Sequence, residues 1–290
     1  MKRFKLGLKS KSLINKRRVL ISTSLNDNYI DGALVMLLSF KENNINYLNY
    51  DYHIYYHDIV SPLSVDNRKK LLKIIPQLKF VNIIDPVYQT APMSSNKGYN
   101  FRTAYLKLEA FSNYGYDYVV FIDSDILCVG DISSLFSIKF DMAACLAGGH
   151  YTLRFNLPIE TEYKEINAGF FVIGRSMLNN NLYQNLKSNI SKYGSPEYMD
   201  QSVINSIFSS STKYKLTTIP TEVYNLRAFD RLSSKTKIIH WSAYNTKPWM
   251  GKPRENEIIN ALKITKSFNY NNVPNKLWTA QKHNVDSIIG

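Results

Sequence analysis

The stretch YDYVVFIDSDILCVGDISSLF, residues 116–136, contains the most hydrophobic strand-like segment of the chain and ends it with two carboxylates. The apolar run YVVFI covers residues 118–122, and Asp123 and Asp125 follow it one residue apart. Aspartate is uncommon in strands and is costly to bury without a partner. Ligands of open α/β sheets bind beyond the carboxyl ends of the strands. The two aspartates therefore occupy the expected place of a ligand site, if such a sheet forms.

Two carboxylates in this arrangement can bind one divalent cation, either directly or through water. Mg²⁺ and Mn²⁺ prefer carboxylate oxygens and share their remaining positions with phosphates. The alternative is that Asp123 or Asp125 only caps the ISSLF turn at 132–136 or the loop before it. A lone Asp-X-Asp motif does not decide between these readings, because such short motifs often match by chance.

The residues around this stretch predict an α/β fold with a mostly parallel central sheet flanked by helices. Strands are expected at 19–25, 50–58, 79–85 and 118–125, and helices at 29–43, 64–76 and 101–115. Strands that alternate with helices of this length are typical of βαβ units. The second half predicts strands at 142–148, 165–174, 214–220 and 235–242, and helices at 176–194, 197–210 and 256–268. We therefore expect a basic arm at 1–18, one catalytic domain at 19–255 and a C-terminal extension at 256–290.

Composition and charge limit the classes of protein that this chain can be. The chain has 290 residues, 44% of them hydrophobic and 20% charged, which is ordinary for a globular protein. Its net charge is +13, and eight basic residues lie within the first 18 positions. This arm is either a solvated tail or a segment attracted to an anionic membrane, an acidic substrate or nucleic acid.

No signal peptide or membrane span is expected, since no apolar segment follows the basic residues and the longest apolar run is too short. The two cysteines, Cys128 and Cys145, form no zinc-binding pattern and are expected to be reduced. These features predict a cytoplasmic protein, with the arm as a peripheral contact to the membrane.

Four further segments contain side chains suited to a nucleotide or a sugar. TSLNDNYIDGALV (23–35) opens the first helix after the first strand, where α/β folds bind nucleotides, although it has no GxGxxG. There Asn26 can bond a base or ribose and Tyr29 can stack on a base. The alternative is turn chemistry, with Gly32 allowing close helix packing. In IIHWSAYNTKPW (238–249), His240 is a candidate ligand and Lys247 a partner for phosphate oxygens.

The remaining candidates are Asn167 in EINAGFFVIGRS (165–176) and Asp200 and Gln201 in YMDQSVIN (198–205), which could bond sugar hydroxyls. Taken one at a time, Asn167 would be an ordinary turn residue, and Asp200 and Gln201 would form the solvated start of a helix. His240 alone would be read as a structural histidine.

The order of the blocks NDNYIDGALV, YLKLEAF, FIDSDILCVGDISSLF, INAGFFVIGRS, MDQSVIN and HWSAYNTKPW resembles glycosyltransferase family 8 over residues 19–250. The resemblance implies a GT-A fold, a UDP-linked sugar donor, Mn²⁺ (or Mg²⁺) and retention of the anomeric configuration. By block, it implies that the metal ligands are Asp123, Asp125 and His240. It also implies donor contacts from Thr23, Leu25, Asn26, Tyr29, Lys107, Ser124 and Lys247, and a reaction centre at Asn167, Asp200 and Gln201. The segment HWSAYNTK departs from the family pattern by one extra residue and a missing glycine, which concerns the phosphate contacts of Lys247.

The resulting hypothesis is a metal-dependent retaining enzyme that moves glucose or galactose from UDP to a carbohydrate acceptor, such as a cell-surface glycan or a lipid-linked saccharide. One alternative is a glycogenin-like primer that glucosylates itself. From another class, a nucleic-acid-binding or nucleotidyl-transferring protein would use the same aspartates and the net charge, but would need a basic stripe on the folded domain. Because most of the excess charge lies in the arm, no nucleic acid is expected.

Overall fold

A computed structural model of the chain describes residues 17–93, 101–148, 165–194, 199–210, 213–228, 230–242, 247–250 and 273–290. Most of the predicted arm and the predicted helix at 256–268 lie outside these residues. No described helix combines the length and the apolarity that crossing a bilayer requires.

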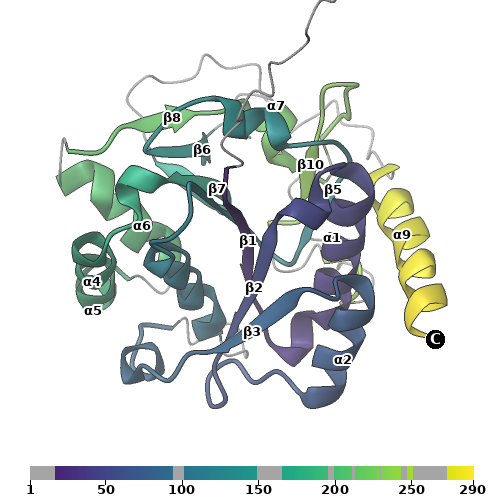
Figure 1. The fold of residues 1–290 in the computed structure, drawn as a ribbon, viewed down its shortest axis with the longest axis horizontal. Helices are drawn as coiled ribbons and strands as arrows, with labels where there is room; N and C mark the ends of the chain where they lie inside the picture. Colours follow the sequence, from purple (N-terminus) through teal and green to yellow (C-terminus); the bar gives the residue numbers. More distant parts are fainter. Residues whose placement is uncertain are drawn as a thin grey trace, which may run out of the picture.

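The described residues form a central sheet of seven strands in the order β3-β2-β1-β4-β7-β6-β8 (Figure 1). The strands are β1 (Val19–Ser24), β2 (Asp51–Tyr56), β3 (Leu78–Asn82), β4 (Tyr118–Ile122), β6 (Met142–Leu146), β7 (Ile166–Gly174) and β8 (Leu216–Thr218). Only β7 among them runs antiparallel to its neighbours, β4 and β6. The prediction of a mostly parallel sheet is therefore confirmed.

Helices cover both faces of this sheet, as the alternating pattern predicts (Figure 1). The described α-helices are α1 (Ile30–Asn43), α2 (Val65–Ile74), α4 (Asn180–Ser188), α5 (Ile190–Tyr193), α6 (Met199–Ser210), α7 (Thr221–Tyr224) and α9 (Val273–Ile289). Ser64 caps α2 as expected, because its hydroxyl accepts a hydrogen bond from the backbone N–H of Asn67. The segment Phe101–Ser112 (η5), expected as an ordinary helix, winds as a 3₁₀ helix.

Shorter 3₁₀ turns connect these elements. They are η1 (Asp27–Tyr29), η2 (Tyr47–Asn49), η3 (Pro86–Gln89), η6 (Ser133–Ser137) and η7 (Arg175–Met177).

Alternate residues of the strands supply two hydrophobic clusters, one on each face of the sheet. In β4, for example, Val120 and Ile122 pack on the face covered by α1, whereas Val119 and Phe121 pack on the face covered by η5 and α6. Side chains of a strand alternate between faces, so a strand that is buried on both faces is apolar throughout. This explains why YVVFI is a continuous apolar run.

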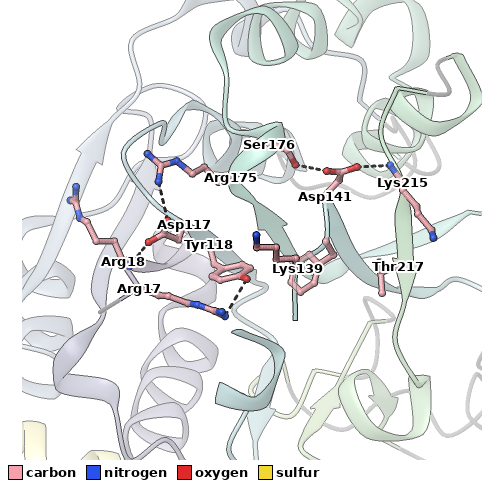
Figure 2. A pocket seen from close by; sticks show the side chains of 11 residues that line it. Arg17, Arg18, Asp117, Tyr118, Lys139, Asp141, Arg175, Ser176, Lys215 and Thr217 are labelled. Atoms are coloured by element: carbon pink, nitrogen blue, oxygen red, sulfur yellow. Dashed lines mark hydrogen bonds and ion pairs between the residues drawn. The ribbon is translucent and has the colours of Figure 1, made fainter. Parts of the chain in front are cut away.

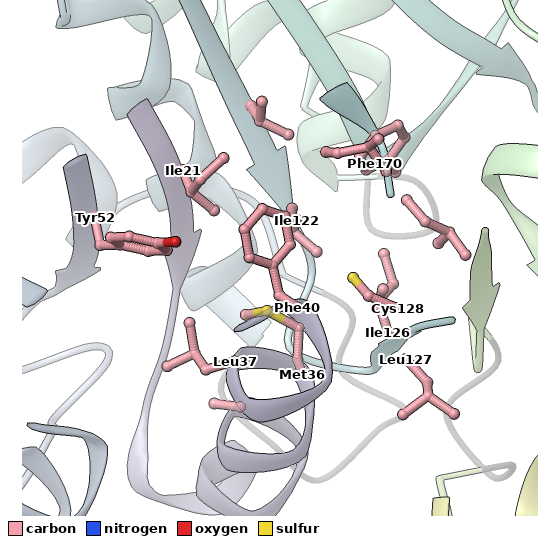
Figure 3. Packing of buried hydrophobic residues seen from close by; sticks show 14 of the residues in the cluster. Ile21, Met36, Leu37, Phe40, Tyr52, Ile122, Ile126, Leu127, Cys128 and Phe170 are labelled. Atoms are coloured by element: carbon pink, nitrogen blue, oxygen red, sulfur yellow. The ribbon is translucent and has the colours of Figure 1, made fainter. Parts of the chain in front are cut away.

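A second, smaller sheet lies beside α1 and consists of β5 (Ile126–Cys128), β10 (Ile238–His240) and β9 (Leu226–Arg227). Figure 3 shows Ile126, Leu127 and Cys128 of β5 in the same cluster as Met36 and Phe40 of α1. β10 pairs antiparallel with β5, and His240 lies opposite Ile126. This pairing brings the end of β10 to the carboxyl end of β4.

The last described helix, α9, packs against α1 and α2, and buries Trp278 and Val285 in the hydrophobic core (Figure 1). No helix is expected here from the sequence, because the resemblance to glycosyltransferase family 8 covers only residues 19–250.

Candidate functional site

Asp123, Asp125 and His240 come together where β4 ends, and each offers a ligand atom within 4.8 Å of the others. The His240 Nε2 atom lies 3.2 Å from an oxygen of Asp125 and 4.0 Å from one of Asp123. Two backbone bonds fix the turn between the aspartates. The N–H of Asp123 donates to the Gly169 carbonyl at 2.8 Å, and the N–H of Trp241 donates to the Asp125 carbonyl at 3.0 Å.

Neither Asp123 nor Asp125 caps the turn at 132–136, which was the alternative to a metal site. The turn at 132–136 is held by Asp131, whose carboxylate accepts hydrogen bonds from the backbone N–H and the hydroxyl of Ser133. Asp123 and Asp125 instead direct their carboxylates toward His240 and two lysines.

Gly169 of β7 makes room for the imidazole of His240. A Cβ atom at position 169 would lie 2.2 Å from the His240 Cε1 atom and 2.9 Å from both ring nitrogens. Only a residue without a side chain allows β7 to pass this close to the histidine. This requirement follows from the packing and is not visible in the sequence.

A chain of hydrogen bonds fixes the orientation of the His240 ring. The backbone N–H of Gly169 donates to the Asn167 Oδ1 atom at 3.1 Å, and that oxygen also accepts from the Asn225 amide at 3.0 Å. The Asn225 Oδ1 atom therefore faces the Nδ1 atom of His240, 2.7 Å away. Since this oxygen can only accept, Nδ1 carries a proton, and Nε2 is the ring nitrogen that faces the carboxylates.

Asn225 is fully buried and was not among the residues predicted from sequence. No signal in VYNLRA marks it, because its role depends on contacts with two distant segments. Asn167 belongs to the same chain of hydrogen bonds. Its side-chain oxygen accepts from the backbone N–H of Gly169, as in a turn, and from Asn225, the residue that faces His240.

Lys107 of η5 connects the metal group to the predicted reaction centre. Its Nζ atom lies 3.1 Å from Asp123, 2.9 Å from Asp200 and 3.0 Å from the carbonyl of Ala168. Burial disfavours the charged form of Lys107, yet Asp123 and Asp200 raise the pKa of this lysine well above its ordinary value. The two carboxylates therefore favour the charged form of this buried lysine.

The carboxylates of the site differ in how readily they ionise. Burial raises the pKa of Asp200 to about 6, against the opposing effect of Lys107. Burial also raises the pKa of Asp123, while Lys107 opposes this shift. Burial acts in the same direction on Asp125, but the Lys247 ammonium outweighs it and holds the pKa of Asp125 well below its usual range.

Asp200 and Gln201 open α6 but do not form a solvated helix start. Asp200 is 5% exposed and paired with Lys107, and the Gln201 side-chain oxygen accepts a hydrogen bond from the backbone N–H of Ala168 at 3.2 Å. Met199, directly before Asp200, has a φ of 41°, a left-handed conformation that is uncommon for methionine. The backbone is thus held in an unusual conformation beside the predicted reaction centre.

Lys247 reaches the site despite the altered spacing after His240. Its ammonium contacts the Asp125 carboxylate and the Trp241 carbonyl, and the side chain is buried. Two residues further, Trp249 packs edge-on against Tyr29, with ring centroids 5.9 Å apart, and stacks on Trp278 of α9 at 5.8 Å. The helix α9 therefore supports the loop that carries Lys247.

The other predicted donor contacts lie near the end of β1 and the start of α1. Asn26 is largely buried, caps the turn at Asp27–Tyr29 and donates to the Thr103 hydroxyl at 2.9 Å. Thr23 and Leu25 are buried, with Leu25 in the hydrophobic core, and Ser124 lies between the two aspartates. A Cβ at Gly32 would lie 2.5 Å from both the Ser124 carbonyl and the Trp249 ring, so Gly32 does allow close packing.

Comparison with known proteins matches residues 20–252 to glycosyl transferase family 8. A search of curated proteins finds no match. Solved structures with a similar fold include a galactosyltransferase, LgtC, in complex with donor and acceptor sugar analogues. It is 16% identical, with 90% of this chain and 99% of that chain covered and a TM-score of 0.61.

Two further similar structures are longer than this chain. One is the bifunctional glycosyltransferase WbbM, 20% identical with a TM-score of 0.58, for which 84% of this chain covers 51% of that chain. The other is the glycosyltransferase GlyE of Streptococcus pneumoniae TIGR4, 16% identical with a TM-score of 0.57, for which 93% of this chain covers 64% of that one. The predicted GT-A fold is confirmed by these likenesses. Since the family match spans most of the chain, the protein belongs to glycosyl transferase family 8.

Proposed function

We propose that the protein is a retaining glycosyltransferase that moves glucose or galactose from a UDP-sugar to a carbohydrate acceptor with the help of Mn²⁺. The observation that carries this proposal is the convergence of Asp123, Asp125 and His240 beside two buried lysines at the carboxyl edge of the sheet. The family membership supports a sugar-transfer reaction and leaves the donor, the metal and the stereochemistry to experiment.

The three proposed ligands suit a divalent cation. One oxygen of Asp125 is buried without a hydrogen bond from any described residue, and it lies 3.2 Å from the Nε2 atom of His240. A cation held between these two atoms would be bound by the carboxylate oxygen and by the lone pair of the neutral imidazole. Carboxylate and imidazole ligands suit Mn²⁺, and carboxylates alone suit Mg²⁺. A bound cation would supply charge stabilisation to the diphosphate leaving group.

The two lysines would complement the diphosphate from the protein side. Negative charge grows on the UDP oxygens as the glycosidic bond breaks, and fixed cations in a buried site stabilise it without a proton transfer. Lys247, which contacts Asp125, would exchange that contact for the phosphate oxygens. Lys107 would remain with Asp123 and Asp200, and would hold both carboxylates in place.

We favour a front-face reaction, in which the leaving phosphate takes the proton of the acceptor hydroxyl. A double displacement needs a free nucleophile beneath the anomeric carbon. The Asp200 carboxylate is paired with Lys107, and the Gln201 oxygen accepts from the backbone. Both side chains would therefore position the donor sugar, together with Asn167.

The proposal predicts that Asp125→Asn abolishes Mn²⁺-dependent UDP release while the fold is retained. The assay measures UDP release from UDP-glucose, UDP-galactose and their N-acetyl forms, with and without Mn²⁺, followed by the anomeric configuration of the product. Circular dichroism checks the fold. Full activity of the variant would exclude the proposed metal site, and failure of every donor to bind or react would exclude the proposed donor class.

We also propose a cell-surface glycan or a lipid-linked saccharide as acceptor, with the basic arm at 1–18 as a contact to anionic membrane. The support is the charge of the arm, since eight basic residues precede the first acid, Asp27. Deletion of 1–18 is expected to weaken binding to anionic vesicles and to spare donor hydrolysis. Unchanged vesicle binding would contradict this role of the arm.

A further inference from the structure

The opposite edge of the sheet carries a cavity of about 940 Å³, which we call the rear basin (Figure 2). Its lining residues precede β1, open β4, β6 and β8, and follow the antiparallel β7. They are Arg17, Arg18, Asp117, Tyr118, Lys139, Phe140, Asp141, Arg175, Ser176, Lys215 and Thr217. The basin therefore lies at the amino ends of the parallel strands, whereas Asp123 lies at the carboxyl end of β4. Nothing in the proposed sugar transfer uses it.

The rear basin carries an excess of positive charge. Five lining residues are cationic and two are acidic, so the net charge of its lining is +3. Among the described residues, Arg175 is the only one of these five cations paired with a carboxylate, that of Asp117 at 3.2 Å. The other four cations of the basin have no carboxylate partner among the described residues. Because like charges repel, their closeness in the basin is electrostatically unfavourable.

The acids of the basin are already engaged by donors from the fold. Asp117 also accepts from the backbone N–H of Arg18 at 2.9 Å, and Asp141 accepts from the Ser176 hydroxyl and from the backbone N–H of Lys215 at 2.9 Å (Figure 2). These bonds hold the rim of the basin together. Among the described residues, no carboxylate pairs with the ammonium group of Lys139 or of Lys215, and both residues line the basin.

Aromatic rings position part of the basic lining. Arg17 lies over the ring of Tyr118, 5.6 Å from its centroid, and its guanidinium donates to the Tyr118 hydroxyl. The ring of Phe140 packs 5.4 Å from that of Tyr118. Ile138, the residue before Lys139, is 56% exposed. A cavity of this size, with cations and an apolar rim, is within the range of small-ligand sites.

We propose that the rear basin binds a phosphate-bearing ligand, with Arg17, Lys139 and Lys215 as its cationic contacts. One guanidinium group can donate two parallel hydrogen bonds to a phosphate group, whereas a lysine ammonium group attracts it as a point charge. The ligand chemistry is shared by the headgroup of an anionic lipid and by a free phosphate compound. The basic arm ends at Arg17 and Arg18, so its charge adds to the attraction of either source.

The test compares Lys139→Ala/Lys215→Ala with the control Lys69→Ala/Lys235→Ala, in the full-length chain. Both variants lose two exposed lysines, and neither touches the site at the carboxyl edge. Binding is measured to phosphatidylcholine vesicles that contain phosphatidylglycerol, and separately to inorganic pyrophosphate in the absence of UDP and of divalent cations. Melting temperature and UDP release establish that both variants are folded and that the transfer site is intact.

We expect the basin variant to bind at least one probe about tenfold more weakly than the control does, since two charge-assisted contacts are lost. A loss confined to vesicles identifies a lipid headgroup, and a loss for pyrophosphate identifies a free phosphate compound. Equal binding by the two variants, or no binding of either probe by the wild type, overturns the proposal. Because UDP release is measured separately, this outcome is distinguishable from a failure of the proposed sugar transfer.

Discussion

Replacing Gly169 with alanine tests whether β7 sets the position of His240. The added Cβ would lie 2.2 Å from the His240 Cε1 atom, whereas carbon atoms in contact are separated by about 3.5 Å. The ring must therefore retreat by about 1.3 Å, the difference between these distances. Misplacement of roughly 1 Å in a functional group can cost on the order of 100-fold in activity.

We expect Gly169→Ala to weaken Mn²⁺ binding and UDP release on the order of 100-fold, because a displaced imidazole no longer faces both aspartates. The fold should survive, with a loss of about 1–3 kcal/mol in the free energy of unfolding from the overpacked contact. Isothermal titration with Mn²⁺ and a thermal melt measure the two effects separately.

Gly130→Ala is the matched control. Its Cβ would meet only Lys237, with the side-chain Cγ nearest at 3.2 Å, and a flexible lysine can move aside. The control should bind Mn²⁺ like the wild type. If Gly169→Ala also binds Mn²⁺ as tightly as this control, the close passage of β7 does not position the histidine and the proposed ligand set is wrong.

Three further predictions concern residues that sequence reasoning did not single out. Asn225→Ala should weaken Mn²⁺ binding about 10- to 100-fold, since the His240 Nδ1 proton loses its acceptor; unchanged ¹⁵N shifts of that imidazole would contradict this. Burial raises the pKa of Glu109 above its ordinary 4.5, so the free energy of unfolding should fall as pH rises from 4.5 through the folded pKa. Glu109→Gln should flatten that dependence in melts across pH, and an unchanged slope would refute the assignment. Trp278→Ala should lower stability by about 3–5 kcal/mol and raise the KM for the donor, because Trp249 loses its stacking partner; an unchanged KM would show that α9 does not support the loop.

The sequence predicts the strand end at which the site lies better than it predicts the contacts between the side chains of the site. Asp123 and Asp125 follow a recognisable buried strand, so their place at the edge of the sheet follows from periodicity alone. The order of the sequence blocks predicts that His240 and Lys247 come near them. Hydrophobic patterning shows locally where the strand before Asp123 ends, whereas the expected places of His240 and Lys247 rest on the resemblance to the family alone.

The contacts that tune the site depend on tertiary packing and leave no local pattern. The bond between Asn225 and His240, the bridge from Lys107 to Asp200 and the room provided by Gly169 each join segments far apart in the chain. The support from Trp278 was missed for another reason, since α9 lies beyond the recognised blocks. Read from sequence, Asp200 was equally compatible with a solvated helix start, and only its burial decides the question.

The antiparallel strand β7 also has a consequence for how the protein folds. Ile122 of β4 pairs with Phe170 of β7, and the chain between them contains β5 and β6. Closing so long a segment costs conformational entropy before any contact is gained, so non-local pairings of this kind form slowly. By contrast, β1, β2 and β3 are consecutive and pair with near neighbours in the chain. We therefore expect the edge where Asp123, Gly169 and His240 meet to form after β1, β2 and β3 have paired. In a chain synthesised from its amino end, the proposed metal group is complete only once β10, which carries His240, has been made.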